Sequence, residues 1–555
     1  PRLEVAAAKT ELFAGDPAAA AARLEAVIAQ ASAPIALYWL SAAYGALGMS
    51  GEQKEFLRRA QLEHGLRIIR DAGGDVQRLK NDHAYAMNVG GLFYDAKQVG
   101  PASVAYGLAA SHGNPTATNL VNYGLALQHQ GRINEAIEAF TLLADLFPSS
   151  RAHEFLLYAC FFAEDGVLRH AREVRRWASL YAPRYDPNAH RFANKRNPNR
   201  KLRIGYVAPS FIGTQVRQFL LPALYAHDTE AFDIYLYAAD GDAEVGLPGK
   251  IITIGKMNDA QAVARIRQDR IDVLVDLWGH TSHGRLGVFA LKAAPVQAAW
   301  INYVQSTGLE AMDYVFHADC MATPGTADLF TEKIWSLGPI HAPFRPDGPP
   351  LEAPTPALCN GYVTFGCFNH PAKLNDPTIA AWARILKAMP NARLVLKYSY
   401  YADPILQNTM CMRFAANGVN PDRIEFRGHS NGPDYLRQFG DIDLALDPSP
   451  CPGGTTSSDA FASGVPVLSL RGEDFYARLA VIHQEPMGLH ELIAETWDDY
   501  VAKAVSLTSH HAALDELRVK VRTVVAASPM RDEAGFTRRL ENAYRAIFAK
   551  WCESA

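Results

Sequence analysis

The strongest candidate for chemistry is the polar stretch at 443–464, DLALDPSPCPGGTTSSDAFASG. We expect a short strand to end at Asp447, and a loop rich in proline and glycine to lead into a helix that begins at Thr455 and Thr456. Glycines allow close backbone approach, and the free amides at a helix N-terminus bind anions. Asp459, one helical turn later, could accept hydrogen bonds from ribose hydroxyls. The stretch predicts a site for a ribose diphosphate. The alternative is that Thr455 only caps the helix and Asp459 only complements its dipole.

A second polar loop follows a predicted strand at 362–368 and carries Asn369, His370 and Lys373. The carboxyl ends of parallel strands meet at one edge of a sheet, so we expect Lys373 to lie opposite the threonine helix. An ammonium there would neutralise a departing diphosphate. The alternative is an ordinary solvated lysine.

A third group follows the predicted buried strand at 271–277, where Asp276 and His280 come close together in the sequence. A carboxylate and an imidazole at a strand end can act as acid–base partners, although His280 could equally be a structural histidine. Four hydroxyl side chains are candidates for substrate binding: Thr281, Ser306 and Thr307 nearby, and Thr214 after the first predicted strand of this series.

The sequence predicts no metal site. It has no HExxH motif, no cluster of cysteine and histidine, and no P-loop. Asp441 and Asp443 resemble the DxD motif of metal-dependent sugar transferases, but they directly precede a predicted apolar strand at 444–446, where a role at the strand edge is expected.

Two series of strands position these loops. The first contains 202–207, 232–238, 271–277, 297–301 and 312–316, and the second contains 362–368, 393–398, 423–427, 443–447 and 465–470. Helical stretches such as 376–388 and 404–416 lie between them. Alternation of this kind predicts two doubly wound parallel sheets, with ligands in the cleft between them. A GxGxxG fingerprint is absent, which disfavours a dinucleotide oxidoreductase.

The first 180 residues have helical spacing and an internal repeat at an offset of 34 residues, which is typical of tetratricopeptide repeats. Small residues allow two helices to approach, and an aromatic residue fills the gap. The repeated positions are Asn88, Gly90, Ala102, Ala105 and Tyr106, which return as Asn122, Gly124, Ala136, Ala139 and Phe140.

Such arrays often bind extended peptides, and this predicts a protein acceptor on the repeats, with Asn88 and Asn122 on the binding face. Two alternatives stay open: an array that only packs or dimerises, and asparagines that only form hydrogen bonds within a repeat.

Composition and net charge limit the classes of partner that we expect for this protein. The 555 residues carry a net charge of −4 with 20% charged residues, so no global positive field attracts nucleic acid or an anionic membrane. Seven cysteines without a CxxC pair indicate reduced thiols rather than a disulfide framework. No run approaches 18 apolar residues, and the first residues lack the pattern of a signal peptide. We therefore expect a cytoplasmic protein that binds neither membrane nor nucleic acid; a homodimer is left open.

The blocks DLWGHT…RLGVFALKAAPVQ…MDY, FNHPAKLNDPTIAAWARIL and LALDPSPCPGGTTSSDAFASGVPVLS resemble the O-GlcNAc transferase/SPINDLY family. The resemblance covers about residues 80–550 and implies tetratricopeptide repeats joined to a two-lobed GT-B region. It implies an inverting, metal-independent transfer of a sugar from a nucleotide-sugar, with UDP the most expected nucleotide, to Ser or Thr of a protein. Bacterial flagellin glycosyltransferases share this arrangement, which makes flagellin a candidate acceptor.

By resemblance, Lys373 contacts the diphosphate, Thr455 and Thr456 form the pair at the phosphate helix, and Asp459 binds the ribose. The resemblance also implies that His370 contacts the base, that Tyr435 stacks on it, and that Thr281 lies near the transferred sugar. Asn369 and Gly454 belong to the same donor-binding loops.

The chain departs from the family pattern SPDFxxHSV. Thr214 stands where the histidine is expected, and Ser210 replaces the acidic residue. Gly454 stands where animal members have a histidine. Threonine cannot act as a base near neutral pH, so these differences predict an altered donor pocket, for example one for a bulkier or acidic sugar.

We expect an α-solenoid over 1–183, a linker over 184–201, an acceptor-side lobe over 202–356 and a nucleotide-sugar lobe over 357–555 that includes the C-terminal helices. The function expected is a protein O-glycosyltransferase without a cofactor other than its donor. The alternatives are a nucleotide-sugar-binding scaffold without catalysis, and a transferase that acts on a small molecule or glycan.

Overall fold

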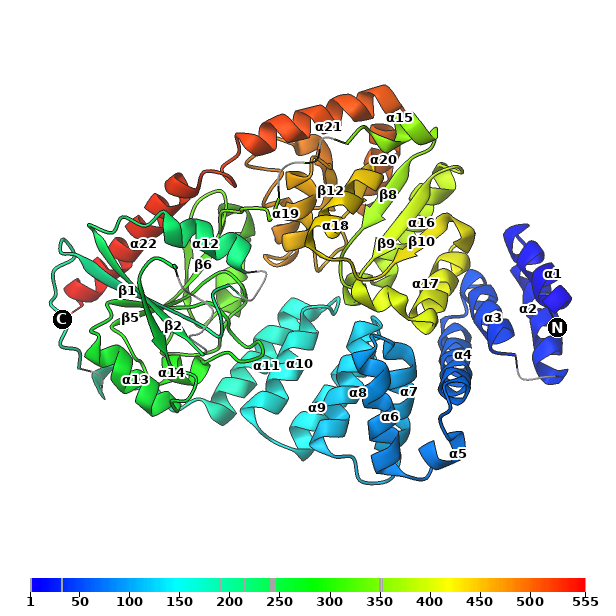
Figure 1. Ribbon diagram of the computed structural model, residues 1–555, viewed down its shortest axis with the longest axis horizontal. Helices are drawn as coiled ribbons and strands as arrows, with labels where there is room; N and C mark the ends of the chain where they lie inside the picture. The colour runs from blue at the N-terminus through cyan, green and yellow to red at the C-terminus, as the bar shows by residue number, and fades with distance from the viewer. Residues whose placement is uncertain are drawn as a thin grey trace.

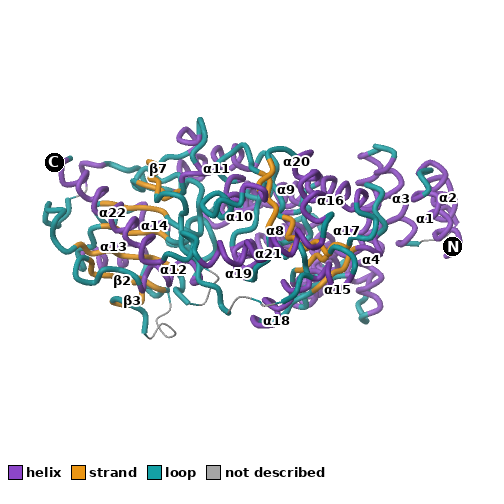
Figure 2. Tube along the Cα trace, turned by 90° about the horizontal axis from the view of Figure 1, so that it is seen from above, coloured by secondary structure: helices purple, strands orange, loops and turns teal. Residues whose placement is uncertain are grey.

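The protein is described by a computed structural model that covers residues 2–30, 33–189, 191–212, 216–239, 246–348, 351 and 353–554. Figure 1 shows a helical array along one side of two α/β lobes. Figure 2, seen from above, shows the N-terminal helices at one end of the molecule and the first lobe at the other. The predicted combination of a tetratricopeptide-like array with a GT-B pair of lobes is confirmed.

The array forms the blue-to-cyan part of Figure 1, from the N-terminus to the first lobe. Its helices are α1 (Arg2–Phe13), α2 (Pro17–Gln30), α3 (Pro34–Ala46), α4 (Ser50–Asp71), α5 (Val76–Leu79), α6 (His83–Asp95), α7 (Val99–Ala110), α8 (Ala117–His129), α9 (Ile133–Leu146), α10 (Ser150–Cys160) and α11 (Gly166–Tyr181).

The 34-residue repeat corresponds to the helix pairs α6–α7 and α8–α9. A Cβ on Gly90 would lie 2.5 Å from the ring of Tyr106, and one on Gly124 would lie 2.4 Å from the ring of Phe140. The absence of a side chain at the glycine therefore lets the aromatic ring of the partner helix fill the gap, as the sequence predicts. Asn122 interacts with the Tyr106 hydroxyl, which supports a hydrogen-bonding role within the array for this residue.

The first lobe contains a sheet whose order, within the described residues, is β3-β2-β1-β4-β5-β6-β7, with every pair parallel. Its elements are β1 (Leu202–Ala208), α12 (Arg217–Tyr225), β2 (Phe232–Ala238), β3 (Lys250–Thr253), α13 (Asp259–Gln268), β4 (Val273–Asp276), α14 (Leu286–Ala290), β5 (Val296–Ala299), β6 (Tyr314–His317) and β7 (Lys333–Ser336).

The second lobe has the order β10-β9-β8-β11-β12-β13, again parallel within the part of the chain that is described. Its elements are α15 (Pro356–Asn360), β8 (Thr364–Cys367), α16 (Asp376–Ala388), β9 (Arg393–Lys397), α17 (Pro404–Ala416), β10 (Ile424–Arg427), α18 (Gly432–Arg437), β11 (Leu444–Leu446), α19 (Thr455–Ala462), β12 (Val467–Leu470), β13 (Ile493–Ala494), α20 (Trp497–Thr508) and α21 (His511–Ala526).

The predicted strands all occur, with ends shifted by a few residues, and α16 and α17 match the predicted helices. The sequence analysis missed β3, β7 and β13. The first two are the edge strands of the first sheet and are partly exposed, and β13 has only two residues. Short strands of this kind lack the continuous apolar run that identifies a buried parallel strand.

The last helix, α22 (Glu533–Glu553), corrects the predicted division at 357–555. It is the red helix in Figure 1, which returns from the second lobe to the first. Its buried residues Phe536, Leu540 and Tyr544 share a core with Leu202 and Val273 of the first sheet. The apolar face of α22 fits the uncovered face of that sheet, so the C-terminal helix belongs structurally to the first lobe.

The described parts of the predicted linker, 184–189 and 191–201, run along the first lobe and bond to it. Arg200 forms an ion pair of 2.5 Å with the buried Asp272, and the Asn194 amide donates to the same carboxylate at 2.7 Å. Among the described residues, no helix is long and apolar enough to cross a membrane.

The array is packed closely on α17 of the second lobe. The backbone amide of Gly100 donates to Asp403, and the Gln61 side chain donates to the Thr409 hydroxyl at 3.0 Å, with both partners buried. A Cβ on Gly45 would lie 2.7 Å from the Ala416 side chain. The repeats and the second lobe therefore form one continuous packed body.

Candidate functional site

The two sheets have their strand-order reversal at β1/β4 and at β8/β11. In open α/β sheets, ligands bind outside the carboxyl ends of the strands at this reversal. In the second lobe, the loop after β8 carries Asn369 to Lys373, and the loop after β11 leads to α19. The sequence predicted both loops, and the structure brings them into contact.

Lys373 joins these two loops. Its Nζ donates to the Pro452 carbonyl oxygen at 2.7 Å and to Oδ1 of Asn369 at 3.2 Å. The Thr456 hydroxyl donates to the same Asn369 oxygen at 2.7 Å. Lysine, asparagine and the threonine helix thus meet as predicted, and both oxygens that Lys373 contacts are uncharged.

The N-terminus of α19 lies beside this lysine. The N-cap residue is Gly454, and no side chain of the described residues caps the helix. The alternative in which Thr455 serves only as an N-cap is therefore wrong: Thr455 is already helical. Gly454 is exposed, and a Cβ placed there would meet no atom within 4 Å. The uncapped amides of the first turn remain available for an anion.

Asp447 shapes the approach to α19, a role that the sequence analysis did not assign. This buried carboxylate accepts from the Gly453 amide at 2.7 Å and from the Ser469 hydroxyl at 3.1 Å. Burial raises its pKa to about 6, while these bonds and Lys373 oppose the shift. Only the fold reveals this role, because Ser469 belongs to the neighbouring strand β12.

Asp459 and Tyr435 are also brought together. The Tyr435 hydroxyl donates to Oδ2 of Asp459 at 3.2 Å, and the Tyr435 ring packs edge-to-face on Phe439. Burial raises the pKa of Asp459 to about 7, against smaller opposing effects of Tyr435 and of Gln218 in α12. Because α12 belongs to the first lobe, this carboxylate lies where the two lobes meet.

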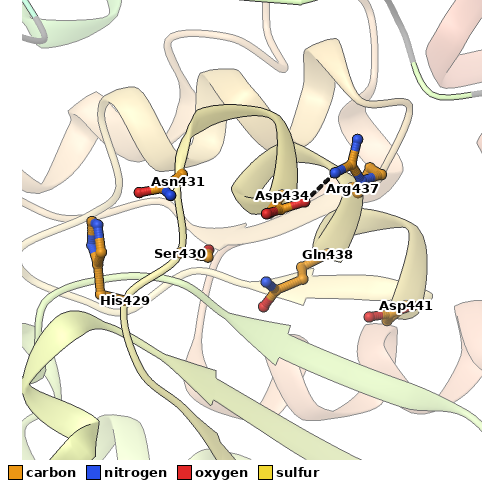
Figure 3. A pocket seen from close by; sticks show the side chains of 7 residues that line it. All are labelled: His429, Ser430, Asn431, Asp434, Arg437, Gln438 and Asp441. Carbon is orange, nitrogen blue, oxygen red and sulfur yellow. Dashed lines mark hydrogen bonds and ion pairs between the residues drawn. The ribbon is translucent and has the colours of Figure 1, made fainter.

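A surface bowl of about 540 Å³ lies beside Tyr435, at the carboxyl end of β10. Figure 3 shows its lining side chains, with Asp434 paired to Arg437 on α18. The sequence analysis missed this bowl, because its polar residues follow an ordinary loop pattern. The lining residues are His429, Ser430, Asn431, Asp434, Arg437, Gln438 and Asp441.

His370 lies in the donor loop, but both of its ring nitrogens are engaged within the protein. Nδ1 accepts from the Ala372 amide at 2.9 Å, and Nε2 lies 2.9 Å from Nδ1 of His129 in α8. The predicted contact of His370 with a base stays a prediction, whereas its contact with the repeat array was not foreseen.

In the first lobe, Asp276 and His280 are each bonded to nearby backbone. The Asp276 carboxylate accepts from the Trp278 and Gly279 amides at 3.2 and 2.8 Å, and burial raises its pKa to about 6. His280 Nε2 donates to the Thr307 carbonyl at 2.8 Å, and burial lowers its pKa to about 4. Nδ1 of His280 therefore carries the lone pair.

The predicted hydroxyl groups of this lobe also have partners. Thr281 donates to the Trp278 carbonyl at 2.7 Å, Ser306 donates to Glu332 at 2.7 Å, and Thr307 bonds to Glu332 through its amide and hydroxyl. The sequence analysis missed Glu332, a buried carboxylate with a raised pKa. Thr214 lies outside the described residues.

Comparisons with known proteins show which family this chain is similar to. The model of glycosyl transferase family 41 matches residues 147–339 and 355–540. The chain is 30% identical over 434 residues to the probable UDP-N-acetylglucosamine–peptide N-acetylglucosaminyltransferase SPINDLY of Oryza sativa, and these residues are 75% of this chain and 46% of that protein. It is 31% identical over 425 residues to the SPINDLY protein of Arabidopsis thaliana, covering 73% of this chain and 46% of that protein.

The chain thus spans slightly less than half the length of these curated relatives. Among solved structures, it is similar to an O-GlcNAc transferase of Thermobaculum terrenum, with a TM-score of 0.77 and 28% identity. That similarity covers 94% of this chain and 99% of the solved one.

Proposed function

Because the chain belongs to glycosyl transferase family 41, we propose that it transfers a sugar from a nucleoside-diphosphate sugar to a serine or threonine hydroxyl of a protein. The proposal includes inversion at the anomeric carbon and no requirement for a metal ion. The relatives are named for UDP-N-acetylglucosamine and peptide acceptors, so a UDP-sugar is the donor class proposed, with UDP-N-acetylglucosamine the first to assay.

The single observation that carries the proposal is the position of Lys373. Its ammonium lies at the uncapped start of α19, held by two uncharged oxygens at 2.7 and 3.2 Å. A departing diphosphate needs positive charge and amide donors where its own charge develops, and preorganised groups supply this without reorganisation. Lys373 together with the amides and hydroxyls of Thr455 and Thr456 provides such a place.

Neighbouring groups support a nucleotide on the far side of the diphosphate. Asp459 would accept hydrogen bonds from the ribose, and Tyr435, which donates to that carboxylate, directly follows Asp434 in the lining of the bowl at 429–441. The bowl has space for a planar base, and its lining is polar. We assign the base to this bowl and the transferred sugar to the side of α19 that faces the first lobe.

Proton removal from the acceptor hydroxyl is assigned to the first lobe. The hydroxyl oxygen attacks the anomeric carbon from the face opposite to the diphosphate, and its proton passes to a base. Asp276 and His280 are the candidates. Nδ1 of His280 carries the lone pair, since Nε2 donates to Thr307; it is buried and has no hydrogen-bond partner within the described residues.

Two observations favour the alternative functions, a binding scaffold without catalysis and a transferase for a small molecule or glycan. Asp276 and His280 both bond to backbone of the first lobe, which favours a nucleotide-sugar-binding scaffold without catalysis. The array packs on α17, which favours a transferase for a small molecule or glycan whose repeats serve assembly.

The test incubates the protein with UDP-, GDP- and CMP-sugars and candidate protein acceptors, flagellin among them, in buffer containing EDTA. Mass spectrometry of the acceptor should find one added sugar on serine or threonine. Tight nucleotide binding with neither transfer nor donor hydrolysis would support the scaffold, and transfer to glycans alone would support the third function. An absolute need for added metal would overturn the metal-independent mechanism.

A further inference from the structure

A chain of hydrogen bonds runs from the repeat array to the donor loop. The Tyr94 hydroxyl on α6 lies 2.9 Å from Nε2 of His129, and Nδ1 of His129 lies 2.9 Å from Nε2 of His370. His370 in turn accepts from the Ala372 amide through Nδ1 at 2.9 Å. These contacts connect two repeat helices to the turn that bears Lys373.

The bonding pattern fixes the direction of this chain. Because Nδ1 of His370 accepts an amide proton, its own proton sits on Nε2 and is donated to Nδ1 of His129. His129 then carries its proton on Nε2 and donates to Tyr94. Both rings are therefore neutral Nε2–H tautomers, and His129 is the acceptor for the only N–H that His370 has.

The two rings are enclosed by aromatic groups from both bodies. Tyr400 of the second lobe stacks on His129 at 4.4 Å between ring centres, and Phe162, which follows α10, stacks on His370 at 6.0 Å. Burial lowers the pKa of His129 to about 4 and that of His370 well below its usual range. At neutral pH both rings stay uncharged, so the contact between them persists.

The backbone of the array also touches the donor loop. A Cβ on Gly131, between α8 and α9, would lie 3.0 Å from the Pro371 carbonyl oxygen. Pro371 begins the 3-10 turn Pro371–Lys373. The array thus contacts this turn through an imidazole at one point and a glycine at another.

We propose that His129 is a positioning residue: by accepting the hydrogen bond of His370, the repeat array holds the turn that presents Lys373 and Asn369 to the donor diphosphate. This inference rests on the proposed function. It gives the repeats a task other than the acceptor binding predicted from the sequence, because a donor loop without this contact would spend only part of its time in the binding conformation. Apparent donor affinity falls in proportion to that fraction.

The experiment compares the full-length wild type with His129→Phe, His129→Asn and a control, His83→Phe. Phenylalanine keeps a ring against Tyr400 but removes the acceptor, whereas asparagine restores an acceptor near the position of Nδ1. His83 is a repeat histidine that bonds to the Ala109 carbonyl within the array. The probes are UDP binding by calorimetry, and donor KM and kcat in the transfer assay.

We expect His129→Phe to weaken UDP binding and raise the donor KM about tenfold with kcat within twofold, since the half-buried Nε2–H of His370 would lose its acceptor and the loss of a hydrogen bond of this kind costs about 1 to 1.5 kcal/mol. His129→Asn should recover most of this loss, and His83→Phe should behave as wild type. Equal UDP affinity in wild type and folded His129→Phe would overturn the inference. So would a loss confined to kcat with unchanged UDP affinity, because the donor loop would then keep its binding conformation without this contact.

A second measurement needs no variant. Nitrogen NMR of the wild type at pH 7 should show both His129 and His370 as neutral Nε2–H tautomers, and a cationic ring or an Nδ1–H tautomer at either position would contradict the chain. If the wild type binds no nucleoside diphosphate while both tautomers are as expected, the proposed function fails. In that case the positioning role of His129 is also wrong, and only the contact between the array and the loop is supported.

Discussion

Lys373 is held by a carbonyl and a carboxamide oxygen rather than by a carboxylate in direct contact. A lysine paired with a carboxylate would have to give up that partner to bind a phosphate, and would gain less from the exchange. Neutral acceptors orient the ammonium without cancelling its charge. At the residue scale, this is what distinguishes Lys373 from the solvated lysine that the sequence left open.

The first prediction concerns this charge. Lys373→Ala should lower kcat of transfer by about 10² to 10³, the usual effect of removing one preorganised donor at a developing negative charge. Circular dichroism and melting temperature should stay near wild type, because Nζ bonds to two loop oxygens and joins no helix or strand to another within the described residues. Lys387→Ala, at an exposed position on α16, is the matched control. Turnover retained by Lys373→Ala would remove this residue from the mechanism.

Some site residues could be predicted from the sequence and others could not. Thr455, Thr456, Lys373 and Asn369 were placed because their loops follow recognisable strands. Asp447 and Glu332 were missed, since each acts through partners on other elements: Ser469 on β12 for Asp447, and the loop at 306–307 for Glu332. A carboxylate that organises a loop has no local spacing that distinguishes it from a surface residue.

At the scale of elements, the glycine–aromatic pairs determine how closely the repeat helices pack. Gly90→Ala should destabilise the protein by about 1 to 3 kcal/mol, because its Cβ would lie 2.5 Å from the Tyr106 ring. Gly91→Ala is the control in the same helix: its Cβ would meet only the Tyr106 hydroxyl, at 3.9 Å. Chemical denaturation measures both, and we expect Gly91→Ala to be neutral or stabilising. Equal effects would refute the close-packing account.

The contact between α7 and α17 predicts a pH dependence. Asp403 is fully buried and accepts from the Gly100 and Ile405 amides, and burial raises its pKa to about 6. The folded state therefore binds a proton between about pH 4 and 6 that the unfolded state releases, so the contribution of Asp403 to stability falls as pH rises through that window.

Asp403→Asn should remove this pH dependence, because a carboxamide does not titrate. Asparagine is also a good helix N-cap, so the start of α17 should be kept. The difference in the free energy of unfolding between variant and wild type should change by up to about 3 kcal/mol from pH 4 to 6, in favour of the variant at the higher pH. Asp498→Asn, at a carboxylate that is 86% exposed, is the control. A constant difference across the window would show that Asp403 does not titrate there.

At the scale of the whole molecule, two contacts hold the parts together. The array packs on α17 of the second lobe, and α22 returns from the second lobe to pack on the sheet of the first. Deleting residues 2–181 would expose the α17 face that carries Ile405, Met412 and Ala415, each 3% exposed or less. We expect the truncated protein to aggregate or to melt at least 10 °C lower. Deletion of 2–30 removes only α1 and α2, which pack on α3, and should lower the melting temperature less. An unchanged melting temperature after the long deletion would mean that the array and the lobes are independent.

Much of this architecture was accessible from sequence because parallel strands and amphipathic repeat helices have strong periodic patterns. The connecting segment after residue 183 was predicted from its composition, and most strand positions were predicted from short apolar runs. The association of α22 with the first lobe and of the array with α17 was not accessible, because both depend on surface fit between distant segments. Tyr544 and Leu202, for example, share a core across more than half of the chain.

The central claim is that the second lobe recognises a nucleoside diphosphate through Lys373 and the start of α19. Calorimetric titration of the wild-type protein with UDP and with uridine tests it most directly, because the two ligands differ only in the diphosphate. The account predicts that UDP binds at least tenfold more tightly, since charge-assisted hydrogen bonds contribute about 1.5 to 3 kcal/mol each. The claim is contradicted if neither UDP nor GDP binds more tightly than its own nucleoside.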